Sequence, residues 1–203
     1  MNKMSLHQGR VNQKLKTRSR ILEAAKVLMS KNRNFSLEEV AKKAKVSRAT
    51  IYRYFPTLEL LYTEASLHVH YSPPQVLFEK VREMPLLESV ITIQNYYNQS
   101  AQDHELLFRR YLSAVLNESI VSKKKIRGAR RVATMELVLA SFEKEMSKNN
   151  LKNLKNIASI LMGIDALIVA KDVCGLTNKE ADETLKWGIE MILKGIQYDK
   201  DRT

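Results

Sequence analysis

Residues 35–55 read FSLEEVAKKAKVSRATIYRYF, and this stretch decides the fold of the N-terminal third of the chain. Its apolar residues recur at helical spacing over 37–44 and again over 48–55. Only a short connection that contains Val46 separates the two segments. The pattern predicts two short helices joined by a tight turn.

Polar residues at the ends of the two segments act as helix start and stop signals. Ser36 is followed three residues later by Glu39, which is the pattern of a capping box. Ser47 is expected to cap the second helix, and Pro56 is expected to end it. Thr57 then caps the next helix.

A third helix precedes this pair, and its apolar residues follow the i, i+3, i+4, i+7 spacing. They are Ile21, Ala24, Ala25 and Leu28, with Thr17 as the expected N-cap and an earlier helix start as the alternative. Val46, Ile51 and Phe55 should face the small core between the three helices. The opposite face of the second short helix then carries Arg48, Ala49, Thr50 and Arg53. This is a helix-turn-helix layout over about 37–56, and a plain three-helix subdomain with a solvated basic face is the alternative.

The charge of the chain is concentrated in the same region. The 203 residues carry a net charge of +12. Residues 1–70 hold 14 Lys and Arg against 5 Asp and Glu, a net +9, and residues 71–203 hold 20 against 17, a net +3. Such an asymmetry indicates a polyanionic partner, for which nucleic acid and an acidic membrane surface are both candidates.

The remainder of the chain predicts long helices, so the fold class is all-α with about nine helices. The expected spans are 58–70, 74–83, 86–102, 104–118, 127–148, 151–173 and 178–198, with a basic loop over 122–127. Gly175 is expected to stop a helix and Thr177 to cap the last one. The expected domain division is a helix-turn-helix domain at 14–70, with DNA as its expected partner, and a larger helical domain at 71–203.

Several classes of protein are disfavoured by composition. No stretch is apolar enough for a transmembrane helix, the first 16 residues lack a secretory signal, and a cytoplasmic location is expected. No phosphate-binding loop, nucleophile elbow or zinc motif occurs, so no enzyme, cofactor or metal is expected. His68, His70 and His104 are expected to be surface histidines, with a shared metal as the weaker alternative. Cys174, the single cysteine, is expected to be a small buried apolar residue, with a thiol sensor as the alternative.

The quoted residues resemble the TetR-type transcriptional regulators. The resemblance covers about residues 15–65: Thr17-Arg18 and Ile21-Leu22 with Ala24-Ala25, then FSLEEVA at 35–41 and VSRATIYRYF at 46–55. It implies an all-helical homodimer in which a small DNA-binding domain precedes a variable domain that binds an inducer. Two positions depart from the family pattern. Lys45 stands where the family usually has Gly in the turn, and Leu58 stands where it often has a phosphate-binding Lys.

The resemblance also implies roles for individual residues. Arg48 and Thr50, with Ala49 beside them, are expected at base edges. Tyr52 and Ser36 are expected at phosphates, with Thr17, Ser47 and Arg53 as weaker candidates. Tyr52 has core packing as its alternative. Arg10, Lys14 and Lys16 are either an arm on the DNA backbone or a tail without function.

If the resemblance holds, the middle helices form the ligand chamber. Its candidate residues are aromatic, amide and apolar: Phe78, Gln94, Tyr97, Phe108, Tyr111 and Met135. Ordinary core packing is the alternative for each of them. Asp165 interrupts an apolar segment and is expected to face a cationic ligand, to pair with Arg130 or Arg131, or to lie on an exposed strip of its helix.

The last two helices have broad apolar faces, which predict a four-helix dimer interface. Its candidate residues are Leu161, Ile168, Leu185, Gly188 and Ile192, and Gly163 and Gly188 are expected to allow close helix approach. Packing within one chain is the alternative. The sequence thus predicts a homodimeric regulator, expected to be a repressor, that binds a double-stranded DNA operator and is released by a small-molecule inducer. The alternative is a basic helical adaptor for a membrane surface or a protein partner.

Overall fold

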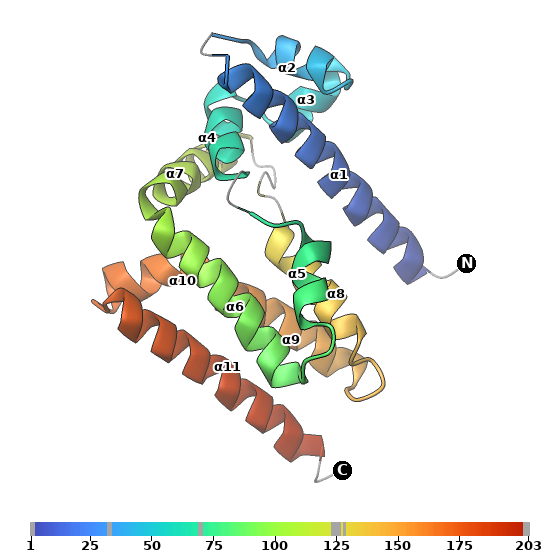
Figure 1. The fold of residues 1–203 in the computed structure, drawn as a ribbon, viewed down its shortest axis with the longest axis vertical. Helices are drawn as coiled ribbons and strands as arrows, with labels where there is room; N and C mark the ends of the chain where they lie inside the picture. The colour runs from blue at the N-terminus through green and yellow to red at the C-terminus, as the bar shows by residue number, and fades with distance from the viewer. Residues whose placement is uncertain (1–2, 32–33, 69–70, 123–126, 128, 201–203) are drawn as a thin grey trace. The chain divides into compact units, whose positions relative to one another are not determined.

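The computed structural model describes residues 3–31, 34–68, 71–122, 127 and 129–200, and over these residues the chain is helical (Figure 1). The described residues form eleven α-helices and one π-helical segment, and they contain no strand. The prediction of an all-α fold is confirmed, although the structure has more helices than the nine expected. No helix among these residues is long and apolar enough to cross a membrane.

The chain divides into two compact units. The first combines Met1–Tyr71 with Leu106–Ala129, and the second combines Ser72–Glu105 with Arg130–Thr203. The division does not follow the linear order of the chain, because a segment from its middle belongs with the N-terminal helices.

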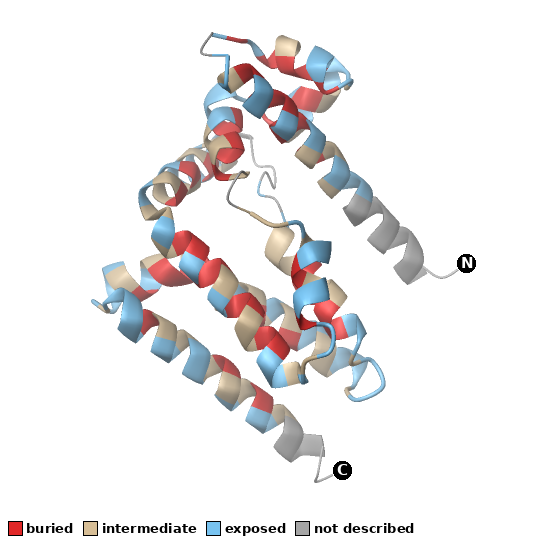
Figure 2. Ribbon diagram, in the orientation of Figure 1, coloured by how far each residue is buried: buried red, intermediate tan, exposed pale blue. Residues whose placement is uncertain are grey.

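The first unit contains α1 (Lys3–Met29), α2 (Leu37–Lys43), α3 (Arg48–Tyr54), α4 (Leu58–His68) and α7 (Glu105–Ser122). Its core is made of aliphatic residues with one aromatic ring, all fully buried (Figure 2): Ile21, Leu22, Ala25, Val40, Ile51, Phe55, Leu60 and Leu61. The last two residues of the expected span 58–70 lie outside the described residues, as does most of the loop expected over 122–127.

The first helix is longer than the sequence pattern predicted. α1 begins at Lys3, so Thr17 lies in its interior and the prediction of an N-cap at Thr17 is wrong. The Thr17 hydroxyl donates a hydrogen bond to the Gln13 carbonyl one turn earlier, at 3.0 Å. That bond lets a residue typical of helix starts sit within a helix.

The second unit contains seven elements, namely α5 (Pro74–Val81), α6 (Leu86–Asp103), α8 (Arg130–Ala140), α9 (Lys148–Ile160), α10 (Ile164–Ile168), the π-helical segment η1 (Val169–Val173) and α11 (Asn178–Lys200). α6 packs against α5, α8, α10 and α11. Buried positions recur along its length (Figure 2). This helix is therefore the centre of the second unit.

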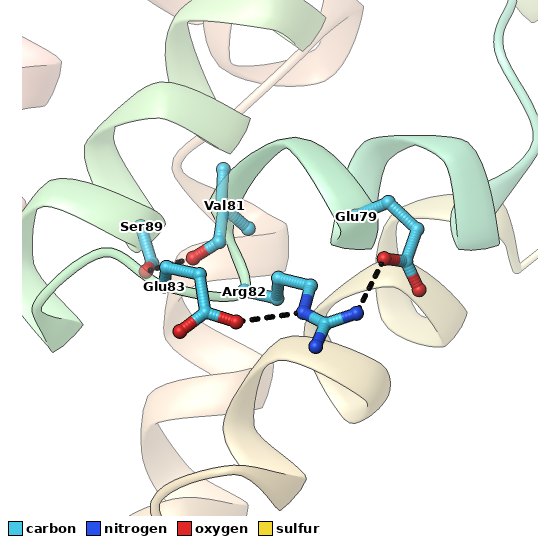
Figure 3. A network of polar contacts seen from close by, with 5 residues as sticks. All are labelled: Glu79, Val81, Arg82, Glu83 and Ser89. Carbon is cyan, nitrogen blue, oxygen red and sulfur yellow. Dashed lines mark hydrogen bonds and ion pairs between the residues drawn. The ribbon is translucent and has the colours of Figure 1, made fainter.

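The turn between α5 and α6 is held by polar contacts on both sides (Figure 3). The Arg82 guanidinium bridges Glu79 at 3.1 Å and Glu83 at 2.8 Å. The Ser89 hydroxyl lies 3.1 Å from the Val81 carbonyl and 3.1 Å from the Met84 carbonyl. The Val81 carbonyl at the end of α5 and the Met84 carbonyl in the turn thus gain a buried partner from the first turn of α6.

The helix expected over 127–148 is wrong in its second half. α8 ends at Ala140, turns follow, and Ser147 begins α9 by accepting a hydrogen bond from the Asn150 amide at 3.1 Å. The sequence contains the signal for this boundary, the N-cap Ser147. Apolar residues at helical spacing before and after it predicted helix across this position.

The helix expected over 151–173 is also wrong as a single element. It breaks at Gly163, which has φ +76° and ψ −162°. Three side chains replace the helical hydrogen bonds that the break removes. Gln94 donates to the Leu161 carbonyl at 2.8 Å, Arg131 donates to the Met162 carbonyl, and Asn98 accepts from the Gly163 amide at 2.8 Å.

Gly163 therefore lies at the break between α9 and α10, and not inside one long helix as expected. A Cβ built on it would lie 3.2 Å from Nη1 of Arg131. The end of η1 follows the sequence prediction more closely. Gly175 has φ +69°, and Thr177 caps α11 with Glu180 as its capping-box partner. Cys174 is exposed, so its prediction as a buried apolar residue is wrong.

Candidate nucleic-acid interface

The start of α2 has the capping box that the sequence predicts. The Ser36 hydroxyl accepts from the Glu39 amide at 3.2 Å, and the Ser36 amide donates to the Glu39 carboxylate at 2.9 Å. At the start of α3 the Ser47 hydroxyl accepts from the Thr50 amide at 3.1 Å. Both short helices therefore begin where local hydrogen bonding dictates.

The turn between α2 and α3 is left-handed at Lys45, where φ is +53°. The next amide, that of Val46, donates to the Ala41 carbonyl at 3.0 Å and closes the end of α2. A non-glycine residue at this φ costs about 1–2 kcal/mol. Lys45 therefore keeps the turn geometry that glycine would adopt without strain.

α3 is divided into a buried face and an exposed face. Ile51 and Phe55 are fully buried, and Val46 is half-buried. On the opposite side Arg48, Ala49 and Arg53 are exposed, and Thr50 is half-buried. This division leaves a polar, basic face of the second helix open to solvent, as the sequence predicted.

A buried ion pair packs against Phe55 at the C-terminal end of α3. The Arg18 guanidinium lies 4.5 Å from the centre of the Phe55 ring and forms two hydrogen bonds with Glu64 of α4, one of them 2.5 Å long. Both charged residues are more than nine-tenths buried, and Tyr111 of α7 is buried beside them. Burial alone would lower the pKa of Arg18, but the carboxylate of Glu64 more than reverses this effect and raises it.

Burial and the charge of Glu64 also raise the pKa of Tyr111. In the sequence, Arg18 is visible only as part of a family motif, and Tyr111 is expected in the ligand chamber. The contacts among Arg18, Glu64 and Tyr111 are not visible in the sequence, because the three residues come from α1, α4 and α7.

The exposed face of the two short helices holds a second cluster. The Tyr52 hydroxyl donates to Oε1 of Glu38 at 2.8 Å, and Nε of Arg48 lies 3.3 Å from the same oxygen. The hydrogen bond from Tyr52 lowers the pKa of Glu38, assisted by Arg48, so the carboxyl group is ionised at neutral pH. Sequence reasoning missed Glu38, since its partners lie one helix further along.

The hydroxyl groups of the other DNA candidates already have partners in the chain. Those of Thr17, Ser36 and Ser47 take part in the helix bonds given above, and the Thr50 hydroxyl lies 2.8 Å from that of Ser47. Leu58 is the first residue of α4 and is 36% exposed. The two basic side chains of α3 in the expected DNA-contact set, Arg48 and Arg53, are exposed.

The comparisons with known proteins identify this part of the chain. Residues 21–65 match the family model described as bacterial regulatory proteins, tetR family. Residues 21–65 therefore form a TetR-type DNA-binding domain. The match runs from the second half of α1 into α4 and includes the whole helix-turn-helix. The domain makes the chain a DNA-binding transcriptional regulator. Comparison with curated proteins and with solved structures finds no match.

The ligand candidates of this regulator fall into both units. Phe108 and Tyr111 are buried in the first unit, where the Phe108 ring lies edge-on to Tyr71 with centres 5.5 Å apart. The other five belong to the second unit: Phe78, Gln94, Tyr97, Met135 and Asp165. The seven residues therefore do not all come from one compact unit.

Two of the second-unit candidates are tied to the helix framework. The Tyr97 hydroxyl lies 2.9 Å from that of Thr134, and burial raises the pKa of Tyr97 to about 12. Asp165 pairs with Arg131 at 2.6 Å, which confirms one of the two partners expected for it.

Gln94 is different, because only one half of its amide has partners. Its nitrogen donates to the Leu161 carbonyl and, at 3.0 Å, to the Leu185 carbonyl, while its buried Oε1 has no partner among the described residues.

The dimer candidates lie on the outer helices of the second unit. Leu161, Ile168, Leu185, Gly188 and Ile192 are half-buried within the single chain. Larger exposed apolar side chains lie near them in sequence: Ile160 at 62%, Trp187 at 61% and Met191 at 37%. Sequence reasoning missed Trp187, although its place on the last helix is visible in the sequence.

Proposed function

We propose that this TetR-family regulator is a homodimeric, sequence-specific repressor that leaves its operator when a small molecule binds. Residues 14–70 form the DNA-binding domain in this proposal, and residues 71–203 form the ligand-binding and dimerisation domain. No cofactor is required, and the protein acts in the cytoplasm, where the DNA is.

The observation that carries this proposal is the exposed basic face of α3 on a capped helix-turn-helix. A recognition helix enters the major groove with its N-terminal residues towards the bases. Arg48 and Thr50 occupy that end of α3 and are proposed to read base edges, with Ala49 in apolar contact. The other proposed contacts are with phosphates: Thr17, Ser36, Ser47, Tyr52 and Arg53.

The proposed homodimer is supported by the apolar side chains at the outside of the second unit. Trp187 and Met191 are one turn apart on α11 and are both exposed. A large exposed aromatic side chain beside apolar neighbours is typical of a subunit interface. A two-fold dimer would present two α3 helices to half-sites about 34–36 Å apart.

The proposed ligand site is supported by the composition of the second unit's interior. Tyr97 and Met135 are fully buried there, and the Gln94 Oε1 atom is a buried acceptor without a partner among the described residues. A mostly apolar interior with one open polar group is the general pattern of small-molecule sites. Release would follow if the ligand favours a state in which the two α3 helices no longer match adjacent grooves, with α4 as the connection to α3.

A gel-shift titration with the DNA upstream of the protein's own gene tests the DNA-binding part of this proposal. We expect that DNA to compete better than random DNA of equal length, and we expect affinity to fall steeply with salt as phosphates are neutralised. Equal competition by random DNA would favour the adaptor for polyanionic surfaces instead.

Arg48→Ala tests the role of the recognition helix. If Arg48 reads a base edge, the change should cost about 1–3 kcal/mol on the specific DNA and much less on random DNA. Arg110→Ala is the control, because Arg110 is exposed on α7 of the same unit. A loss of equal size on both DNAs would make Arg48 a phosphate contact.

A further inference from the structure

Glu38, Arg48 and Tyr52 form the Glu38 cluster, which places a carboxylate among the side chains that are proposed to contact DNA. The Glu38 side chain is 43% exposed, so solvent reaches it, and that of Arg48 is 76% exposed. A carboxylate on such a surface repels phosphates. Its presence there calls for a function other than raising the general affinity for DNA.

The geometry of the cluster suggests what this function is. Glu38 approaches Arg48 at Nε, which leaves the two terminal nitrogens of the guanidinium unoccupied by this ion pair. Those two nitrogens can donate side by side to O6 and N7 of a guanine. The Arg48 guanidinium also lies 5.7 Å from the centre of the Tyr52 ring, so the ring restricts it on a further side.

Tyr52 completes the arrangement, because its hydroxyl donates its only proton to the carboxylate that faces Arg48. In this arrangement Tyr52 does not donate to a phosphate, and this role replaces the phosphate contact proposed for it above. One oxygen of Glu38 accepts from Tyr52 and faces Nε of Arg48. A long arginine side chain otherwise loses rotamer freedom when it binds a base. Because Glu38 already restrains Nε of Arg48, the side chain loses less conformational entropy when it binds a base. The negative charge of Glu38 also weakens contacts between Arg48 and phosphates.

We propose that Glu38 is a positioning residue that makes Arg48 selective for guanine over the DNA backbone. The proposal rests on the proposed DNA-binding function. Glu38 does not itself contact a base in this arrangement. Its effect is on the ratio of specific to non-specific affinity, because it presents the two terminal nitrogens of Arg48 and opposes phosphate contacts.

Glu38→Ala and Glu59→Ala form a matched pair for the test. Each glutamate lies in the first turn of its helix in the first unit, and each change removes one negative charge. Glu59 differs in that its carboxylate has no polar partner among the described residues. Glu38→Gln is added because it removes the charge and keeps an acceptor oxygen for Tyr52. Thermal melting checks that all three variants are folded.

The wild-type protein first selects duplexes from a random library, and each variant then binds the selected duplex and a scrambled one. We expect the affinity ratio of selected to scrambled DNA to fall about tenfold in Glu38→Ala, less in Glu38→Gln, and to stay unchanged in Glu59→Ala. The selected guanines are then replaced one at a time by 7-deazaguanine, which lacks N7. At one position this replacement should lower the DNA affinity of the wild type and change that of Glu38→Ala little.

The proposal is overturned if Glu38→Ala and Glu59→Ala have the same ratio of affinities for selected and scrambled DNA. It is also overturned if 7-deazaguanine lowers the DNA affinity of the wild type and of Glu38→Ala equally. The failure of the proposed function is a separate result. In that case the wild-type protein itself would enrich no sequence from the library, and the positioning role would fall with it.

Discussion

At the scale of single residues, Lys45 shows how a helix-turn-helix tolerates a non-glycine turn. Its φ of +53° lies in the left-handed region, and its side chain is exposed. The bonds that close the turn, such as that from the Val46 amide to Ala41, are all present. The free-energy cost of the non-glycine turn therefore comes from the backbone conformation of Lys45 alone.

Lys45→Gly should raise the free energy of unfolding of the first unit by about 1 kcal/mol, because glycine adopts this φ without a Cβ penalty. Urea unfolding measures the effect. Lys42→Gly is the control, since Lys42 is exposed within α2 and glycine there should lower stability by about 1 kcal/mol. A loss of stability in both variants would contradict the assignment of strain to Lys45.

Also at the residue scale, Arg18 and Glu64 form an ion pair almost completely removed from water. Removal of one partner from such a pair leaves a buried charge without compensation. The pair joins α1 to α4 beneath the end of α3, so its loss should affect the whole helix-turn-helix.

Glu64→Gln should lower the free energy of unfolding by about 3–5 kcal/mol, because the Arg18 charge stays buried without its carboxylate. The comparison is Glu23→Gln. Glu23 is 55% exposed and 3.2 Å from His68, and its loss should cost at most about 1 kcal/mol. Equal effects in urea unfolding of the two variants would mean that the Arg18–Glu64 pair contributes no more than a surface pair.

At the scale of elements, the break between α9 and α10 is the largest departure from local sequence preference. The break would leave buried carbonyl and amide groups unpaired if no side chain reached them. Gln94, Asn98 and Arg131 supply those bonds from α6 and α8. The break is thus stabilised by neighbouring helices, and glycine is needed only at its centre.

Gly163→Ala should destabilise the second unit by about 1–3 kcal/mol, because alanine is strained at φ +76° and ψ −162°. Its Cβ would also press on Arg131, which sits 3.2 Å away. Gly195→Ala is the matched control in α11, where an added Cβ meets no heavy atom within 4 Å. There alanine should raise stability by up to about 1 kcal/mol in thermal melting. A gain at both glycines would show that the break imposes no backbone constraint.

At the scale of the whole molecule, the helix-turn-helix and the exposed apolar side chains of α11 belong to different units. The first unit contains the helix-turn-helix, and the second unit exposes Trp187 and Met191 on α11. If the dimer forms through α11, a charge at Trp187 should disrupt it without disturbing the core of either unit.

Trp187→Glu should convert the dimer to monomers, since a buried carboxylate at the interface would lack a partner. Size-exclusion chromatography with light scattering gives the mass. Val76→Glu is the control, because Val76 is 46% exposed on α5 of the same unit and lies outside the proposed interface. A mass of two chains for Trp187→Glu would place the interface elsewhere.

The sequence by itself determined the helix-turn-helix. Its caps at Ser36 and Ser47 and the end of α3 depend on contacts between residues at most four positions apart. Interactions of this range are encoded in local spacing and residue type, so they can be read without knowledge of the rest of the fold.

Only the tertiary structure decided the break at Gly163, the place of α7 beside the N-terminal helices, and the Glu38 cluster. Gln94 reaches a carbonyl 67 residues away, Arg18 pairs with Glu64 46 residues away, and Tyr52 bonds Glu38 14 residues away. Local periodicity does not specify which side chain meets which backbone group over such separations, because that depends on how the helices pack.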